Sequence, residues 1–97
     1  MLFRSANGIE LVDAPVSGGS EGAQKGKLTV FLGGSGKAAL RARPLLAAFA
    51  PTVTHLGPLG SGQVGKAVNQ LVISGAYLSL AEGILVGQRA EIGRAHV

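Results

Sequence analysis

Apolar residues occur along the chain in three short runs followed by one long run. The short runs, residues 9–13, 28–34 and 52–56, contain β-branched residues and end in glycine or proline. Such runs are typical of buried strands. Residues 63–89 contain no proline and are predicted to form one long helix. The order of these elements predicts an α/β fold.

Residues 36–50 have helical character but contain a proline. Pro44 has no backbone N–H, and its ring clashes with the preceding turn of a helix. We therefore expect two short helices, the first ending near Ala42 and the second beginning at Pro44.

The predicted long helix is apolar around most of its circumference, and such a helix has to be covered by other protein or by lipid. Nothing else in the chain is large enough to cover it. We therefore expect a partner, either a second chain or a further part of the same protein. The composition changes near Gly60, and we predict two domains, residues 6–59 and 60–90.

Composition excludes several classes of function. The net charge is +4, but the basic residues are scattered and only four aromatic residues are present, so we expect no nucleic-acid partner. The longest apolar run contains Glu82, and we expect no membrane partner. The chain has no cysteine, which predicts no disulfide and favours a cytoplasmic location. His55 has no second histidine nearby, so we predict no metal site.

The two ends differ from the rest of the sequence. Residues 1–5, MLFRS, and 91–97, EIGRAHV, correspond to what common sequencing adapters encode when they are translated. We expect both to be foreign, and residues 6–90 to be the biological part.

The stretch GSGQVGKAVNQ, residues 60–70, is close to a phosphate-binding loop. That motif needs a Ser or Thr hydroxyl after its lysine to bind Mg²⁺, and Ala67 has none. On a helix, Lys66, Asn69 and Gln70 share one face. A cation and two amides on an otherwise apolar helix indicate a site in which Lys66 is a general acid or base. The alternative is a lysine solvated at the end of the helix.

Ser17, Gly18 and Gly19 follow the first predicted strand. Successive glycines let backbone N–H groups converge on an anion, and a serine hydroxyl adds a donor. The alternative is an ordinary turn. Asp13 is either a buried acid with a role or a cap of this loop through backbone N–H groups, and we favour the cap.

Two motifs together resemble one family. Residues 13–19, DAPVSGG, with Ala23, Gly26 and a strand that ends at Gly33-Gly34, resemble the substrate-binding signature of β-hydroxyacid dehydrogenases. This group includes 3-hydroxyisobutyrate dehydrogenase and tartronate semialdehyde reductase, with 6-phosphogluconate dehydrogenase more distant. Residues 60–70 resemble its catalytic stretch, Gly-x-Gly-x-x-x-Lys-x-x-Asn.

The resemblance implies a role for each site residue. Ser17, Gly18 and Gly19 would hold the substrate carboxylate, and Lys66 would be the general acid/base. Asn69 would orient the substrate. Gln70 stands where many members have a second asparagine, and this variant is similar to the tartronate semialdehyde reductase branch.

The resemblance also implies a fold and an activity. The chain would supply the C-terminal strands of a Rossmann-like sheet, followed by the first long helix of an all-α domain. The whole enzyme would use NAD or NADP to interconvert a small β-hydroxyacid and its semialdehyde, as a homodimer or homotetramer. The family's nucleotide-binding Gly-x-Gly-x-x-Gly unit does not precede Ile9, so we expect an inactive middle fragment with its cofactor-binding residues unknown. The alternatives are a non-catalytic binding module and a self-associating helical protein.

Overall fold

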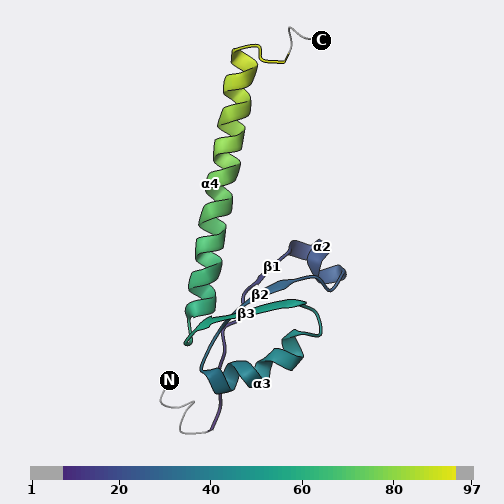
Figure 1. Cartoon of the computed structure of the whole chain (residues 1–97), viewed down its shortest axis with the longest axis vertical. Coiled ribbons are helices and arrows are strands. Elements are labelled where there is room, and N and C mark those ends of the chain that lie inside the picture. The colour runs from purple at the N-terminus through teal and green to yellow at the C-terminus, as the bar shows by residue number, and fades with distance from the viewer. Residues whose placement is uncertain (1–7, 94–97) are drawn as a thin grey trace. The chain divides into compact units, whose positions relative to one another are not determined.

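The computed structural model describes residues 8–93. In this part of the chain three strands and three helices form, and Figure 1 shows their order. They are β1 (Val16–Ser17), α2 (Gly19–Gln24), β2 (Thr29–Gly33), α3 (Gly36–Leu46), β3 (Thr52–Gly57) and α4 (Ser61–Arg89). The strands predicted at residues 28–34 and 52–56 and the long helix predicted at 63–89 are therefore confirmed within one or two residues.

The three strands form one sheet in the order β1-β2-β3. β1 pairs with β2 antiparallel, with Val16 opposite Val30, and β2 pairs with β3 parallel, with Val30 opposite Val53. Parallel neighbours need a crossover connection, and α3 provides it. The predicted α/β fold, with strands of a Rossmann-like sheet followed by a long helix, is confirmed.

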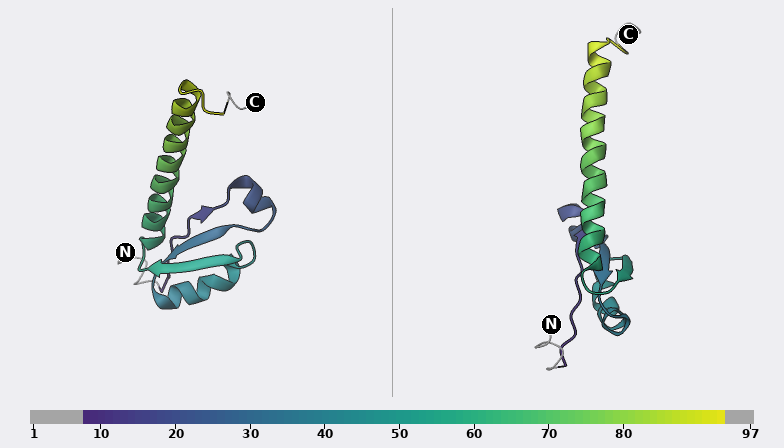
Figure 2. Two further views of the ribbon diagram at one scale, coloured as in Figure 1. Left: turned by 45° about the horizontal axis from the view of Figure 1, so that its top comes forward. Right: turned by 90° about the vertical axis from the view of Figure 1, so that its left-hand side faces the viewer.

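The core lies between the sheet and α3, which runs along one face of the sheet (Figure 2). Val30 and Leu32 alternate along β2 toward this face and are fully buried. Ala39 of α3 packs in the same core, and its small side chain lets the helix approach the sheet closely. Phe31 and Gly33 therefore lie on the opposite face of β2. The start of α4 lies close to these two residues.

α3 is one helix, so the prediction of two helices separated at Pro44 is wrong. Ser35 caps its start, because Ala38 N–H donates to the Ser35 hydroxyl at 3.1 Å. Pro44 lies in the last turn of the helix, where few further backbone hydrogen bonds depend on it. Three residues after Pro44, the backbone N–H of Ala47 donates to Arg43 O at 2.9 Å, so the helical path continues past the proline.

The prediction of a buried strand at residues 9–13 is also wrong. Ile9 and Leu11 are 54% and 51% exposed. Val12 packs against the core, but the backbone of the segment pairs with the sheet at one bridge, between Asp13 and Gly33. β-branched residues favour a strand only where a neighbouring strand pairs with them, and none of the described residues pairs with residues 9–12. α2 was not predicted, because its glycine-rich sequence lacks apolar periodicity.

The chain forms two compact units, Met1–Ala67 and Val68–Val97. The boundary predicted between residues 59 and 60 stays a prediction. The second unit consists mainly of the later part of α4, whose apolar side chains are exposed, among them Leu71, Leu78, Ile84 and Val86. The residues predicted to be foreign, 1–5 and 91–97, lie outside the described residues except for a turn at 91–93.

By length and composition alone, α4 meets the criterion for a membrane-spanning helix, with a mean hydropathy of 1.4. Helices in the cores of soluble proteins meet the same criterion, so this is weak evidence for a membrane. The charge of Glu82 within the helix argues against a span, and the absence of a membrane partner stays a prediction.

Two glycines allow the start of α4 to lie against β2. A Cβ atom on Gly62 would meet the carbonyl oxygen of Phe31, and it would lie 2.8 Å from both the backbone oxygen and Oδ2 of Asp13. A Cβ atom on Gly33 would meet the side chain of Asp13 and would lie 2.7 Å from the nitrogen of Gly62. Any larger residue at either position would separate the helix from the strand.

We predict that Gly62→Ala in the whole protein lowers the free energy of unfolding by about 1–3 kcal/mol, because the added methyl group meets backbone oxygens that cannot move aside. Urea unfolding measures this change. Gly36→Ala is the matched control, since a Cβ atom on Gly36, at the start of α3, meets nothing within 4 Å. Equal stabilities of the two variants would contradict the close approach.

Candidate functional site

The loop after β1 presents backbone donors at the surface. Gly18 and Gly19 have φ angles of 132° and 64°, a region that favours glycine, and both are exposed. α2 begins at Gly19 without a side-chain cap, so its first N–H groups have no partner within the helix. The half-buried hydroxyl of Ser17 lies at the start of the same loop. This arrangement can bind an anion such as a carboxylate.

Lys66 lies beside this loop. It is half-buried in the second turn of α4, and its Nζ donates a hydrogen bond to the carbonyl oxygen of Val16 at 2.8 Å. Val16 directly precedes Ser17, so residues 50 positions apart in the sequence come together. The fold thus places the predicted acid/base group next to the predicted carboxylate-binding loop.

Asp13 forms a cap, but not on the loop where we predicted it. Its Oδ1 accepts a hydrogen bond from Gly60 N–H at 2.7 Å, and its Oδ2 accepts one from Gln63 N–H at 2.8 Å. Both donors belong to the start of α4, where unpartnered N–H groups and the helix dipole favour a negative charge. The first turn of α4 has no acidic residue of its own, which is the signal that could have pointed to a distant carboxylate.

These hydrogen bonds change the acidity of Asp13. Burial raises the pKa of the carboxyl group, but the surrounding backbone N–H groups, chiefly those of Gly60 and Gln63, together lower the pKa below its ordinary value. The ionised form is the one that these donors stabilise. At neutral pH the start of α4 is therefore held by a carboxylate.

The cap by Asp13 also explains why residues 60–70, which are close to a phosphate-binding loop in sequence, do not form one. Residues 60–65, GSGQVG, also fit the nucleotide-binding pattern Gly-x-Gly-x-x-Gly, and they lie between a strand and a helix. In a nucleotide site the N–H groups of such a turn bind phosphate. Here Gly60 and Gln63 donate to Asp13 instead, so this turn does not fit a cofactor pyrophosphate.

Asn69 and Gln70 belong to the second compact unit. The side-chain amide of Asn69 donates a hydrogen bond to Oε1 of Gln70 at 3.2 Å. Asn69 is half-buried and Gln70 is exposed. Their predicted contact with substrate stays a prediction.

His55 has a structural role. Its Nε2 lies 2.8 Å from the carbonyl oxygen of Gly34, which can only accept, so this nitrogen carries the proton. The bond connects the C-terminal ends of β2 and β3. Within residues 8–93 no cluster of three potential metal ligands occurs.

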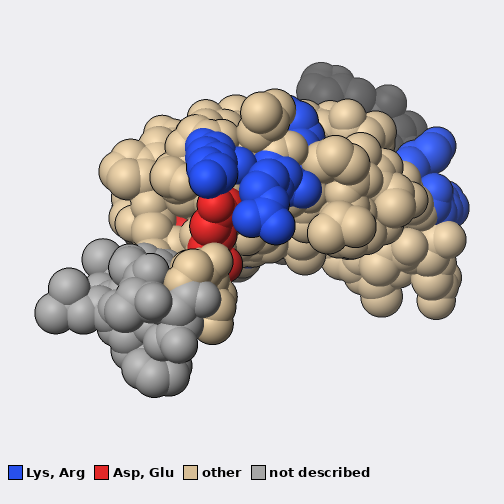
Figure 3. Space-filling model, turned by 90° about the horizontal axis from the view of Figure 1, so that it is seen from below, with Lys and Arg blue, Asp and Glu red and all other residues tan. Residues whose placement is uncertain are grey.

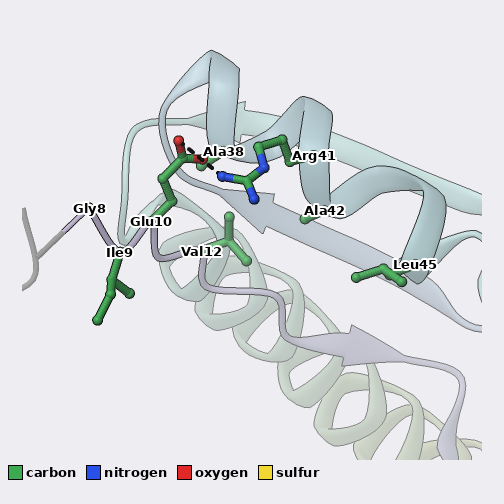
Figure 4. A pocket seen from close by; sticks show the side chains of 8 residues that line it. All are labelled: Gly8, Ile9, Glu10, Val12, Ala38, Arg41, Ala42 and Leu45. Atoms are coloured by element: carbon green, nitrogen blue, oxygen red, sulfur yellow. Dashed lines mark ion pairs between the residues drawn. The ribbon is translucent and has the colours of Figure 1, made fainter.

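A hollow of about 340 Å³ lies elsewhere, between residues 8–12 and α3 (Figure 4). Glu10 and Arg41 point toward each other across it, with 3.5 Å between Oε1 and Nη1, and Lys37 lies 3.7 Å from the same oxygen. On the face drawn in Figure 3, acidic side chains accordingly lie against basic ones. None of the predicted site residues lines this hollow, and exposed ion pairs of this kind contribute little to stability.

Comparison with known proteins gives this site a context. Residues 3–57 match a family described as the NAD binding domain of 6-phosphogluconate dehydrogenase. The NAD-dependent L-serine dehydrogenase of Pseudomonas aeruginosa is 41% identical over 80 residues, which cover 82% of this chain and 27% of that protein. The 2-(hydroxymethyl)glutarate dehydrogenase of Eubacterium barkeri is 40% identical, with the same two coverages.

A solved structure is similar as well. The 3-hydroxyisobutyrate dehydrogenase of Mycobacterium tuberculosis, solved with L-serine, superposes with a TM-score of 0.89 at 31% identity. The match covers 96% of this chain and 32% of that chain. The present chain thus spans about a quarter to a third of the length of these proteins.

We predict that stability of the whole protein decreases as the pH falls below the ordinary aspartate pKa of about 3.9. Because folding lowers the pKa of Asp13, its contribution is complete above that value and is lost as the pH falls through the folded-state pKa. Urea unfolding between about pH 7 and about pH 2 measures this loss. Asp13→Asn should show a smaller pH dependence, whereas Ser61→Ala, at the same helix start, should keep that of the wild type. Identical pH profiles for Asp13→Asn and wild type would contradict the cap.

Proposed function

The chain belongs to the family of the NAD binding domain of 6-phosphogluconate dehydrogenase, among the β-hydroxyacid dehydrogenases, and from this membership we propose that the whole protein is an NAD(P)-dependent oxidoreductase of small 3-hydroxy carboxylates. One observation carries the proposal for this chain: the hydrogen bond of 2.8 Å from Lys66 to Val16 O. It sets a proton-transferring group one residue away from a loop suited to a carboxylate.

The compounds in the relatives' names define the substrate class. L-serine, 3-hydroxyisobutyrate and 2-(hydroxymethyl)glutarate all carry a hydroxymethyl group on the carbon next to a carboxylate. They differ only in the third substituent of that carbon, which is an amine, a methyl group or a carboxyethyl chain. The proposed substrate shares the hydroxymethyl carboxylate unit. Its two polar ends match the loop and the lysine.

Each site residue has a proposed task. Ser17 and the backbone N–H groups of Gly18 and Gly19 bind the substrate carboxylate. Lys66 accepts the hydroxyl proton during oxidation and returns a proton to the carbonyl oxygen during reduction. The carbonyl of Val16 orients the amine for this transfer. Asn69 and Gln70 orient the substrate on the next turn of the helix.

NAD or NADP supplies the hydride chemistry when it is bound. The turn at residues 60–65 is occupied by Asp13, so the proposal assigns the phosphates of the cofactor to residues outside 8–93. Initial rates with NAD⁺ and with NADP⁺ measure which of the two cofactors the protein prefers. Gln70 favours a member close to tartronate semialdehyde reductase, for which glycerate is the hydroxymethyl carboxylate to test.

The exposed apolar surface of α4 fits the proposal. In a protein as long as the relatives, the remaining two thirds or more of the chain is available to cover these side chains. We propose that the remaining chain and further copies of the protein, in a homodimer or homotetramer, cover the apolar side chains of α4. Neither lipid nor self-association of the isolated helix is then needed to cover them.

We predict that Lys66→Met in the whole protein lowers kcat by about 10²- to 10⁴-fold, because the general acid/base is removed while the apolar stem is retained. Initial rates with NAD⁺ and NADP⁺ on L-serine, 3-hydroxyisobutyrate and glycerate measure this loss. Lys37→Met is the control and should keep wild-type rates, because Lys37 is exposed and its partner among the described residues is Glu10, outside the site. Turnover that survives Lys66→Met would show that the lysine is not the acid/base.

We further predict that Ser17→Ala mainly raises KM for the hydroxy acid, by about 10- to 100-fold, since it removes one hydrogen bond to a charged group. KM for the cofactor should change little. Steady-state kinetics with each substrate varied in turn separate the two effects. A change confined to the cofactor KM would remove Ser17 from the carboxylate site.

A further inference from the structure

We propose that Asp13 is a positioning residue for the reaction: its carboxylate fixes the start of α4 so that Lys66 is held over the Ser17–Gly19 loop. This inference rests on the proposed function for the reaction that Lys66 performs. Asp13 itself lies at the start of α4 and acts through the helix, not through a contact with substrate.

The bond between Asp13 and α4 is strong and directional. Both carboxylate oxygens are used, one on Gly60 N–H at 2.7 Å and the other on Gln63 N–H at 2.8 Å. Hydrogen bonds of this length to an ionised acceptor are roughly twice as strong as neutral ones. Since the two donors lie three residues apart, the carboxylate holds the first turn of α4 at two points.

The backbone of Asp13 is fixed independently of its side chain. Asp13 N–H donates to Gly33 O at 3.0 Å, and Gly33 N–H donates to Asp13 O at 2.8 Å. This pair of bonds anchors Asp13 to the end of β2. Gly62 has no side chain to separate the helix from the strand, and a Cβ atom there would lie 2.8 Å from Oδ2 of Asp13. The carboxylate therefore connects a rigid strand end to a closely packed helix start.

One segment of chain holds α4 at two points. The side chain of Asp13 holds its first turn, and Val16 O accepts from Lys66 one turn later. Ser17 follows directly on this segment. The distance between the lysine and the loop is thus set by residues 13–16 and by the helix start that Asp13 holds. Loss of the carboxylate would remove both side-chain hydrogen bonds to the helix start and leave the close packing at Gly62 and the bond from Lys66 to Val16 O.

The test uses the whole protein with its cofactor and compares wild type, Asp13→Asn and Asp13→Ala. Asp13→Ala should lower kcat by about 100-fold, the loss expected from a displacement of about 1 Å. Asp13→Asn keeps one acceptor oxygen and should lie between Asp13→Ala and wild type. KM for the cofactor should stay near that of wild type in both. The solvent deuterium isotope effect on kcat should rise, because transfer of the hydroxyl proton to a displaced lysine becomes slower.

The isotope effect separates positioning from stability. A variant that is only less stable contains fewer active molecules, which lowers kcat equally in H₂O and D₂O. Amide hydrogen exchange of residues 60–66 supplies a second readout that does not depend on activity, and it should be faster in both Asp13 variants. Glu10→Gln, three residues earlier on the same segment, is the control. Within residues 8–93 Glu10 pairs with the exposed cations Lys37 and Arg41, and this variant should match wild type in every measurement.

The outcomes distinguish this inference from the function on which it rests. An inactive wild-type protein would overturn the proposed function, whatever the exchange rates show. An active wild type in which Asp13→Asn and Asp13→Ala lose activity without a rise in the isotope effect would overturn the positioning role alone. Unchanged exchange at residues 60–66 would do the same. Should Asp13→Ala fail to fold, Asp13→Asn alone decides by the same criteria.

Discussion

The carboxylate of Asp13 at the start of α4 is the interaction on which the arrangement of the site depends. A helix of 29 residues begins with N–H groups that have no partner within the helix, and Asp13 satisfies two of them from a point 47 and 50 residues earlier in the chain. Burial of a carboxylate costs free energy, but the hydrogen bonds outweigh that cost, and the pKa of Asp13 is lowered as a result. The close approach is possible because Gly33 and Gly62 have no side chains.

The position of Lys66 follows from that constraint. Once the first turn of α4 is held against the end of β2, the second turn brings the lysine to the carbonyl of Val16. Lys66 is thereby placed next to the exposed glycine turn at Gly18 and Gly19. The proposed substrate, with a carboxylate at one end and a hydroxyl group at the other, matches these two features. The three relatives are named after, or solved with, molecules of that kind.

The hydrogen bonds of Asp13 also decide whether the glycine-rich turn at residues 60–65 binds phosphate or has a structural role. A glycine-rich turn between a strand and a helix commonly binds phosphate through the N–H groups of the helix start. In this chain an internal carboxylate takes those N–H groups, which leaves the turn with a structural role. The lysine that follows donates a hydrogen bond to Val16 O, directly before the loop at Ser17. A motif in a sequence therefore indicates which groups are present, whereas the partner of each N–H decides what the motif does.

The sequence by itself determined the elements that local pattern controls. β-branched runs predicted β2 and β3, and a proline-free run that is apolar around most of the helix predicted α4. Two motifs predicted roles for the loop at Ser17 and for Lys66, and these roles stay predictions. The sequence did not determine residues 9–12, since a strand forms only where another strand pairs with it, nor the continuation of α3 through Pro44, where the last turn has few hydrogen bonds to lose. Only the tertiary structure decided that Asp13 caps α4 and that Lys66 reaches Val16. Both contacts join residues about 50 positions apart, and local sequence carries no information about which distant group will supply a hydrogen-bond partner.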